Sequence, residues 1–305
     1  MSRDRSPETA AVHGILLVDK PEGLSSAAVV ARVKHELGQR KVGHLGTLDP
    51  FATGLLPICV GEGTKLAQFL AADAKRYVGE IALGTVTDTL DRTGTVVERR
   101  SVPPLAPGAV ARAVATLRGP IMQTPPMYSA LKRDGVPLYR LARAGQEIAR
   151  APRPVQVTAF DVAVIAPDRL AFAVDCSKGT YVRVLAHDLG AALGTGAHLH
   201  SLRRTGFGPF RIDDAVPLDR LGRLAEAGAL PLLSPSAAMT GYRAIVADAP
   251  LIAAIRHGRQ YALRVLGAPR AVSEVVRIES ADGALIAVAE AAGEEGWRLA
   301  RVMAS

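Results

Sequence analysis

The sequence is poor in the features that mark membrane, disulfide-stabilised or metal-binding proteins. Its two cysteines, Cys59 and Cys176, both lie inside apolar runs, which favours buried thiols over a disulfide. None of its seven histidines pairs with a cysteine at the spacing of a zinc site. No apolar run approaches the roughly 18 to 20 residues that span a bilayer, and the polar first ten residues lack the apolar segment of a secretory signal. We therefore expect a cytoplasmic protein with no membrane segment, no metal and a disordered lead over residues 1–12.

Charge is the main signal in the composition. Lys and Arg number 37 against 29 Asp and Glu, which gives a net charge of +8 and a pI near 9.8. Basic surfaces attract polyanions, because phosphate binding releases counterions. Charge alone does not separate a nucleic-acid-binding protein from other basic proteins. The apolar content of 49% is that of a globular protein, and 305 residues suffice for one large domain and a small one.

Several elements follow from periodicity and caps. Ser25 or Ser26 can cap a helix that ends at Gly38, and residues 108–118 form an amphipathic helix stopped by Gly119-Pro120. Residues 155–164 and 169–176 read as strands, the second with apolar residues at every other position from Leu170. Thr180 can cap a further helix. Residues 213–235 read as mostly helical before a turn at Ser234-Pro235, and 251–257 as a helix followed by short strands.

One carboxylate stands out in residues 41–63, K-V-G-H-L-G-T-L-D-P-F-A-T-G-L-L-P-I-C-V-G-E-G. Asp49 has no other acid near it before Glu62, and Pro50 fixes the chain just after it. The apolar residues 55–60 predict a buried strand. This layout holds one acid rigidly on a loop above the core, as an enzyme with a single nucleophilic or basic carboxylate requires. A turn in which Asp49 only bonds nearby amides is the alternative.

The run G-H-L-G-T-L-D-P-F-A-T-G-L-L-P resembles motif II of the TruB family of tRNA pseudouridine-55 synthases. Four further blocks resemble the same family: D-K-P-E-G-L-S-S at 19–26, K-R-Y-V-G-E-I-A-L-G-T-V-T-D-T-L-D at 75–91, S-K-G-T-Y-V-R-V-L-A-H-D-L-G at 177–190 and A-H-L-H-S-L-R-R-T-G-F-G-P-F at 197–210. The resemblance covers most of residues 13–212, with a weaker match in the tail.

This resemblance implies both a fold and an activity. The fold is α+β, with a mixed, largely antiparallel sheet over residues 13–235, a cleft across it, and a small β-rich PUA-like domain over 241–305 that extends the RNA-contact surface. The activity is isomerisation of the T-loop uridine (position 55) of tRNA to pseudouridine after the base is flipped from its stack. No cofactor is expected, in line with the lack of nucleotide-binding glycine motifs.

The resemblance also assigns roles in the active site. Asp49 is the catalytic acid, attacking either C1′ of the ribose or C6 of the base, and Arg183 pairs with it to keep it ionised. Without the resemblance, Arg183 reads as an ordinary surface arginine.

Four further residues are implied to meet the substrate: Tyr77 stacks on the base, Tyr181 and Leu202 border it, and His44 contacts the opened RNA loop. A lone histidine is more often structural, and a core tyrosine in a strand is compatible with stacking. Asp88 and Asp91 are interpreted as structural or RNA-proximal rather than as a second catalytic acid.

Residues 123–154 have the composition of a nucleic-acid contact element, with six basic residues against two acids and two interleaved tyrosines. In the family this segment is an insertion that clamps the tRNA T-arm, and we expect it to be mobile without RNA. The predicted RNA contacts are Lys20, Lys132, Arg133, Arg140, Arg143, Arg203 and Arg204. For Lys20, a solvated lysine is the alternative.

Two other functions stay open. One is the guide-RNA-dependent relative that works in a multi-protein particle, although the insertion and small tail favour a stand-alone bacterial enzyme. The other is a tRNA-binding folding factor with incidental chemistry. We expect tRNA as the partner, no obligate protein partner, and a monomer.

Overall fold

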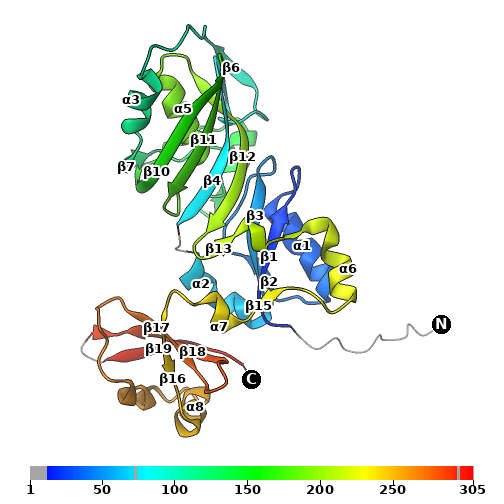
Figure 1. Ribbon diagram of the computed structural model, residues 1–305, viewed down its shortest axis with the longest axis vertical. Helices are drawn as coiled ribbons and strands as arrows, with labels where there is room; N and C mark the ends of the chain where they lie inside the picture. Colours follow the sequence, from blue (N-terminus) through cyan, green and yellow to red (C-terminus); the bar gives the residue numbers. More distant parts are fainter. Residues whose placement is uncertain (1–11, 72–73, 294–295, 305) are drawn as a thin grey trace, which may run out of the picture.

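The computed structural model describes residues 12–71, 74–293 and 296–304. The predicted disordered lead therefore lies outside the described residues, apart from Val12. The described chain contains one large sheet, one four-stranded sheet and two short two-stranded ribbons. Figure 1 shows the small sheet as a separate unit at one end of an elongated molecule.

The large sheet is mixed and mostly antiparallel. Its order is β14 (Val216–Pro217), β1 (Gly14–Lys20), β3 (Thr53–Val60), β12 (Ala197–Phe207), β4 (Lys75–Leu83), β11 (Arg169–Cys176), β10 (Arg153–Ala166) and β7 (Gly119–Gln123). Off this path, β2 (Val42–His44) pairs with β3, β13 (Phe210–Arg211) with β12 and β15 (Leu232–Leu233) with β1. Within this sheet, the described pairs β1 with β14 and β3 with β12 are parallel. The fold class predicted from the sequence is confirmed.

Helices pack on this sheet at two places (Figure 1). Beside β1 lie α1 (Ser26–Leu37) and α6 (Leu221–Glu226), while α3 (Ala109–Ala115) and α5 (Val182–Ala192) lie beside the strands at the far end. The remaining helices are α2 (Ala67–Leu70), α4 (Leu138–Arg143), α7 (Pro235–Ala238), α8 (Ala249–Arg256), and the 3₁₀ segments η1 (Gly61–Leu66), η2 (Ile212–Asp214), η3 (Leu218–Arg220) and η4 (Gln260–Leu266). No described helix combines the length and the apolar character needed to cross a membrane.

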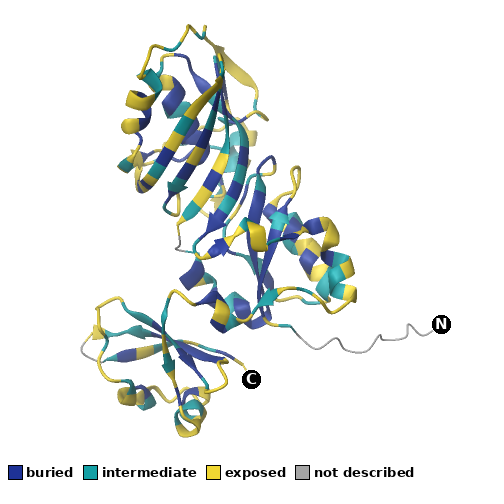
Figure 2. Ribbon diagram, in the orientation of Figure 1, coloured by how far each residue is buried: buried dark blue, intermediate teal, exposed yellow. Residues whose placement is uncertain are grey.

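Local sequence rules explain most elements. The Ser25 hydroxyl accepts from the Ala28 amide at 3.1 Å, and Gly38 ends α1 in the left-handed region at φ +60°, as predicted. Apolar alternation along β11 buries every second residue from Leu170, and Figure 2 shows the same banding on neighbouring strands.

Three local predictions were wrong. Thr180 does not cap α5, whose N-cap is Tyr181 and carries no side-chain cap bond. Residues 213–235 are not one helical run, because Pro217 and Gly228 interrupt it. The segment contains η2, β14, η3, α6, β15 and the first residue of α7. Ser234 begins α7 rather than making a turn, and its hydroxyl accepts from the Ala237 amide at 3.1 Å.

The insertion and the C-terminal unit contain short elements. Within residues 123–154 lie β8 (Lys132–Arg133), β9 (Val136–Pro137) and α4. The other ribbon is β5 (Thr85–Thr87) with β6 (Val96–Arg99). The small sheet has the order β16 (Arg243–Val246), β17 (Val275–Glu279), β18 (Leu285–Ala291) and β19 (Trp297–Val302). Its Leu285 and Val288 share a buried cluster with Ile15, Leu17 and Leu55, so the unit packs on the large sheet.

Candidate active site

The Asp49 loop connects β2 to β3 in the middle of the large sheet. Backbone bonds close it: the Ala52 amide donates to Asp49 O at 3.1 Å, and the Gly23 amide donates to Pro50 O at 2.8 Å. The hydroxyl of Ser26, at the start of α1, accepts from the Leu48 amide at 2.8 Å and donates to Leu48 O at 3.2 Å. The acid is therefore presented from a loop with several fixed points.

Lys20 supports this loop from inside the protein. It is fully buried, and its Nζ donates to Pro21 O at 2.8 Å, Leu24 O at 2.7 Å and Pro50 O at 3.2 Å. Burial lowers the pKa of the Lys20 ammonium to about 8. The predicted phosphate contact and its solvated alternative are both wrong, because three carbonyls use the ammonium donors inside the fold.

Arg204 supports the same loop from a second strand. It is fully buried in β12; its Nε donates to Leu55 O at 2.7 Å and its Nη2 to Gly46 O at 3.1 Å. The predicted phosphate contact at Arg204 is therefore also wrong. Arg203 points to the other face, as neighbours in a strand do, and forms a two-bond pair with Asp19 at 3.0 and 2.7 Å.

Arg183 meets Asp49 through two atoms. Its Nε lies 2.9 Å from Asp49 Oδ2, and its Nη2 lies 3.3 Å from Oδ1. The side chain of Arg183, in the first turn of α5, is 4% exposed, whereas that of Asp49 is 34% exposed. The predicted ion pair is present, with the arginine beneath and the carboxylate facing outward.

The rest of the Arg183 guanidinium is also held. Its Nη1 donates to Thr89 O at 2.9 Å and its Nη2 to Tyr128 O at 2.8 Å. Its Nε also lies 3.7 Å from Asp91 Oδ2. Two main-chain carbonyls and two carboxylates therefore fix the plane of the guanidinium.

Asp91, interpreted from the sequence as structural or RNA-proximal, lies beside Arg183. It is buried, and its Oδ1 accepts from Thr89 Oγ1 at 2.8 Å and from the Thr93 amide at 2.9 Å. These bonds leave Oδ2 facing Arg183. The T-D-T-L-D run in the sequence indicates this arrangement, because it places Asp91 near threonines whose hydroxyls can donate to its carboxylate.

Burial raises the pKa of the Asp49 carboxyl above its ordinary value; Arg183 opposes this shift, and the charge of Asp91 adds to it. Burial and Arg183 thus act in opposite directions on one carboxyl, which is paired with a guanidinium and still reachable from the pocket. Such a group is suited to act as a nucleophile or a base.

A pocket of about 360 Å³ opens in front of this pair. Among the residues that line it are Asp49, Tyr77, Tyr181, Arg183 and Leu202. Tyr77 lies opposite Arg204 in the register of β4 and β12. Five predicted site residues from four parts of the chain therefore share one cavity.

His44 is not among the residues lining this pocket, and it ends β2 next to the pocket-lining Leu45. The predicted RNA contacts Lys132, Arg133, Arg140 and Arg143 are exposed on the insertion. The sequence predicted no role for Gln123, which entered only as the first residue of the insertion. In the structure it is buried, and its carboxamide forms hydrogen bonds with the main chain of Tyr181.

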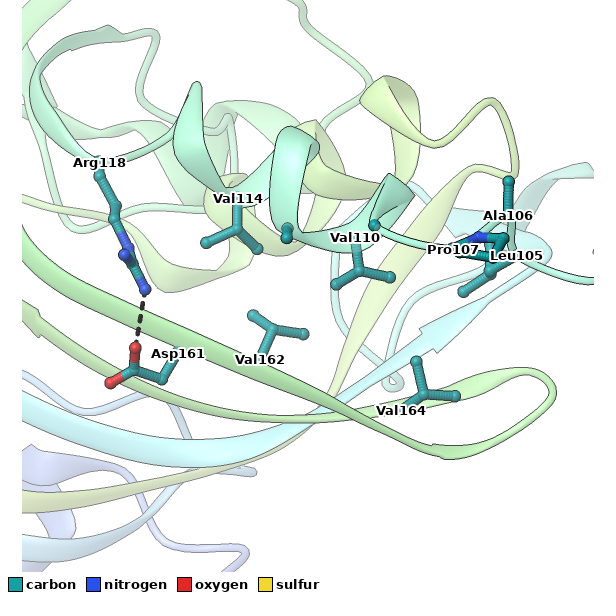
Figure 3. A pocket seen from close by; sticks show the side chains of 11 residues that line it. Leu105, Ala106, Pro107, Val110, Val114, Arg118, Asp161, Val162 and Val164 are labelled. Carbon is teal, nitrogen blue, oxygen red and sulfur yellow. Dashed lines mark hydrogen bonds and ion pairs between the residues drawn. The ribbon is translucent and has the colours of Figure 1, made fainter.

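A second pocket, of about 520 Å³, lies between α3 and β10 (Figure 3). Its walls are apolar, with Val110, Val114, Val162 and Val164 among them, and one ion pair joins Arg118 to Asp161 at its edge. It contains none of the predicted site residues. The described residues also contain no cluster of His, Cys, Asp and Glu that could hold a metal ion.

Comparisons with known proteins agree along the chain. Residues 34–182 match the TruB family pseudouridylate synthase (N terminal domain), and residues 183–230 match the tRNA pseudouridylate synthase B C-terminal domain. The tRNA pseudouridine synthase B of Geobacter sulfurreducens is 49% identical over 249 residues, covering 81% of this chain and 82% of that protein. That of Burkholderia mallei is 45% identical over 284 residues, covering 92% and 94%.

Two solved structures share the fold. A Cbf5-Nop10-Gar1 complex matches with a TM-score of 0.72 and 27% identity, covering 96% of this chain and 84% of that one. An H/ACA RNP bound to a substrate RNA containing 2′-deoxyuridine matches with a TM-score of 0.73 and 24% identity, covering 96% and 86%.

The fold and these comparisons together define an isomerase of the pseudouridine synthase class, and in this chain a paired aspartate lies on a loop at the centre of a mixed sheet. The sequence identity of 45 to 49% to proteins named tRNA pseudouridine synthase B, over most of the chain, narrows this class to one family. The chain belongs to the TruB family of pseudouridine synthases.

Proposed function

We propose that this protein converts the T-loop uridine of tRNA (position 55) to pseudouridine. The observation that carries the proposal is the Asp49–Arg183 pair, with its nitrogen–oxygen distance of 2.9 Å, at the floor of the pocket. The relatives named tRNA pseudouridine synthase B support tRNA as the substrate. The enzyme would act in the cytoplasm, on tRNA.

The uridine must leave its stack before Asp49 can reach it. A cavity of about 360 Å³ has room for one nucleobase, and a base still stacked between its neighbours could not enter it. Tyr77, Tyr181 and Leu202 line it, and aromatic faces stack on any base. The flipped uracil would lie among these three side chains, with its ribose toward Asp49.

The chemistry is a rearrangement with no net gain or loss of atoms. Asp49, as the carboxylate, attacks C1′ of the ribose or C6 of the base, and the bond between N1 and C1′ breaks. The uracil turns in the pocket, and a bond forms between C5 and C1′. The bond to Asp49 breaks and regenerates the carboxylate, the C5 proton leaves, and N1 gains a proton from solvent. Arg183 keeps Asp49 ionised and aimed through its two contacts of 2.9 and 3.3 Å.

The insertion would clamp the T-arm. Four of its exposed basic side chains, Lys132, Arg133, Arg140 and Arg143, can each meet a phosphate. His44, beside the pocket wall, would contact the opened loop. The catalytic unit spans residues 13–235, and the four-stranded unit at 241–305 would serve as the PUA-like RNA contact.

The enzyme would work as a monomer without a guide RNA or an obligate protein partner. Relatives named tRNA pseudouridine synthase B are 45 to 49% identical to this chain, while the Cbf5-containing assemblies are 24 to 27% identical. The higher identity favours the stand-alone mode of action.

A single-turnover assay on an unmodified tRNA transcript, tritiated at uridine C5, tests the proposal. Purified wild type alone should release tritium, and Asp49→Asn should not. Release should disappear when the T-loop uridine is replaced by another nucleotide. Tight tRNA binding without release by wild type would instead favour the folding-factor function, and release only after a guide RNA or partner is added would favour the guide-dependent one.

A further inference from the structure

Gln123 is a buried polar side chain that no step of the reaction uses. It is the last residue of β7 and is 2% exposed. Its Oε1 accepts from the Tyr181 amide at 2.7 Å, and its Nε2 donates to Tyr181 O at 3.1 Å. Both functional atoms of one carboxamide thus bind the main chain of one residue.

These two hydrogen bonds fix the main chain of Tyr181, at the start of the helix that carries Arg183. Tyr181 is the N-cap of α5, and no side-chain cap bond forms at this helix end. The first amides of a helix have no hydrogen-bond partner within the helix. Hydrogen bonds from another element can therefore fix the position of the chain where it enters the helix. Gln123 supplies these bonds from a neighbouring strand, and the pocket-lining Arg183 lies two residues further on.

The chain that follows Gln123 touches the site a second time. Residues 123–128 are the first part of the insertion, where the chain leaves β7, and Tyr128 O accepts from Arg183 Nη2 at 2.8 Å. The same Nη2 faces Asp49 Oδ1 at 3.3 Å. One short segment therefore holds the backbone of Tyr181 and one edge of the Arg183 guanidinium.

We propose that Gln123 is a positioning residue for the isomerisation. Its carboxamide fixes the start of α5, so that the Tyr181 ring meets the flipped base and Arg183 meets Asp49. This inference rests on the proposed function. It assigns the stem of the insertion to the catalytic site as well as to RNA binding.

The first test replaces Gln123 by Met, which keeps the length of the side chain but removes both hydrogen bonds. We expect the single-turnover rate to fall roughly tenfold or more, as the loss of two buried hydrogen bonds suggests. The Kd for tRNA should stay within about twofold, because phosphate contacts dominate it. The matched control is Gln156→Met, an exposed glutamine on β10 that pairs with β7, and it should behave as wild type.

The second test uses Gln123→Glu across pH. A protonated carboxyl can accept from the Tyr181 amide and donate to Tyr181 O, as the carboxamide does, whereas a carboxylate can only accept. Burial favours the protonated form. We therefore expect the rate of Gln123→Glu, divided by that of wild type, to rise several-fold as the pH falls from about 8 to about 6. The same ratio for Gln123→Met should stay flat.

The outcomes separate the two proposals. A wild type that makes no pseudouridine would overturn the proposed function. An active wild type accompanied by Gln123→Met at the same rate would overturn only the role of Gln123. If the Met variant fails to fold, a Gln123→Glu ratio that does not change with pH rejects the positioning role, and a ratio that rises supports it.

Discussion

Asp49 and Arg183 show how one residue sets the properties of another. Burial alone would favour the neutral carboxyl, while the nearby guanidinium favours the charged one, with Asp91 pulling against it. Arg183 is fixed by Thr89 O and Tyr128 O, so it cannot follow a moving carboxylate. The pair is thus preorganised, and both its charge and its geometry can be tested separately.

Replacing Asp49 by Asn removes the nucleophile and keeps the shape of the side chain. We expect the single-turnover rate to fall at least about a thousandfold, since a carboxamide cannot take over the attack. The Kd for tRNA should change by less than about threefold. Pseudouridine made at the wild-type rate by this variant would reject the assignment of the nucleophile.

The rate should depend on pH through the ionisation of Asp49. As the proposed nucleophile, Asp49 acts only as the carboxylate, so activity should be complete at high pH and lost as the pH falls through a pKa that burial raises above the ordinary carboxyl value. Arg183→Met removes the opposing charge, so its acid limb should lie at higher pH than that of wild type. Arg183→Lys keeps a charge and should shift the limb less. Identical acid limbs in all three proteins would show that Arg183 does not control this ionisation.

At the scale of elements, the Asp49 loop depends on strands that are distant in sequence. Lys20 at the end of β1 and Arg204 in β12 both donate to carbonyls of the loop and its flanks. The backbones of β3 and β12 approach closely at Gly54. This residue has φ +99°, and a Cβ there would lie 2.3 Å from Arg204 O. The loop and its supporting strands therefore form one packed unit.

Gly54→Ala should destabilise this unit. The left-handed conformation and the backbone clash together predict a loss of about 3 kcal/mol in the free energy of unfolding. Urea unfolding monitored by circular dichroism measures it. Gly43→Ala is the matched control, because Gly43 in β2 has no positive φ and no atom within 4 Å of a built Cβ. Equal stability of the two variants would contradict the argument.

The insertion should contribute through charge. Arg143→Ala, at the end of α4, should weaken tRNA binding and reduce the slope of log K against log salt by about one unit. Arg140→Ala should act similarly. The control is Arg112→Ala, an exposed arginine on α3, which should leave the slope unchanged. A slope unaltered in the insertion variants would argue against the clamp.

At the scale of the whole molecule, Glu62 joins the C-terminal strand to the large sheet. Its Oε1 accepts from Lys41 Nζ at 2.8 Å, and its Oε2 accepts from Lys65 Nζ at 2.5 Å and from the Ala304 amide at 2.7 Å. Lys65 Nζ also donates to Val302 O at 2.7 Å. Burial pushes the pKa of Glu62 up, but these donors outweigh it and lower the pKa to about 2.

Glu62→Gln should loosen this junction in a pH-dependent way. A depressed pKa stabilises the fold above the ordinary value of 4.5, and this contribution is lost as the pH falls from about 4.5 toward 2. The variant should be less stable than wild type near pH 7, and the difference should shrink near pH 3. Urea unfolding at both pH values measures this, with the exposed Glu147→Gln as the control. A difference independent of pH would reject the linkage.

The sequence by itself determined the fold class and the family, and it predicted residues that the structure brings together in one pocket. Asp49, Tyr77, Arg183 and Leu202 each lie in a short run whose residue types are recognisable without neighbours in space. The apolar alternation in β11 and the caps of α1 are equally local, because each depends on residues only a few positions apart in the sequence.

Only the tertiary structure decided what the buried polar residues do. Lys20 and Arg204 are basic in the sequence, but packing turns them toward loop carbonyls instead of toward phosphate. Gln123 and Asp91 reach Tyr181 and Arg183 across 58 and 92 positions of the chain. Such contacts depend on which strands become neighbours and which face each side chain takes, and neither is fixed until the sheet has formed.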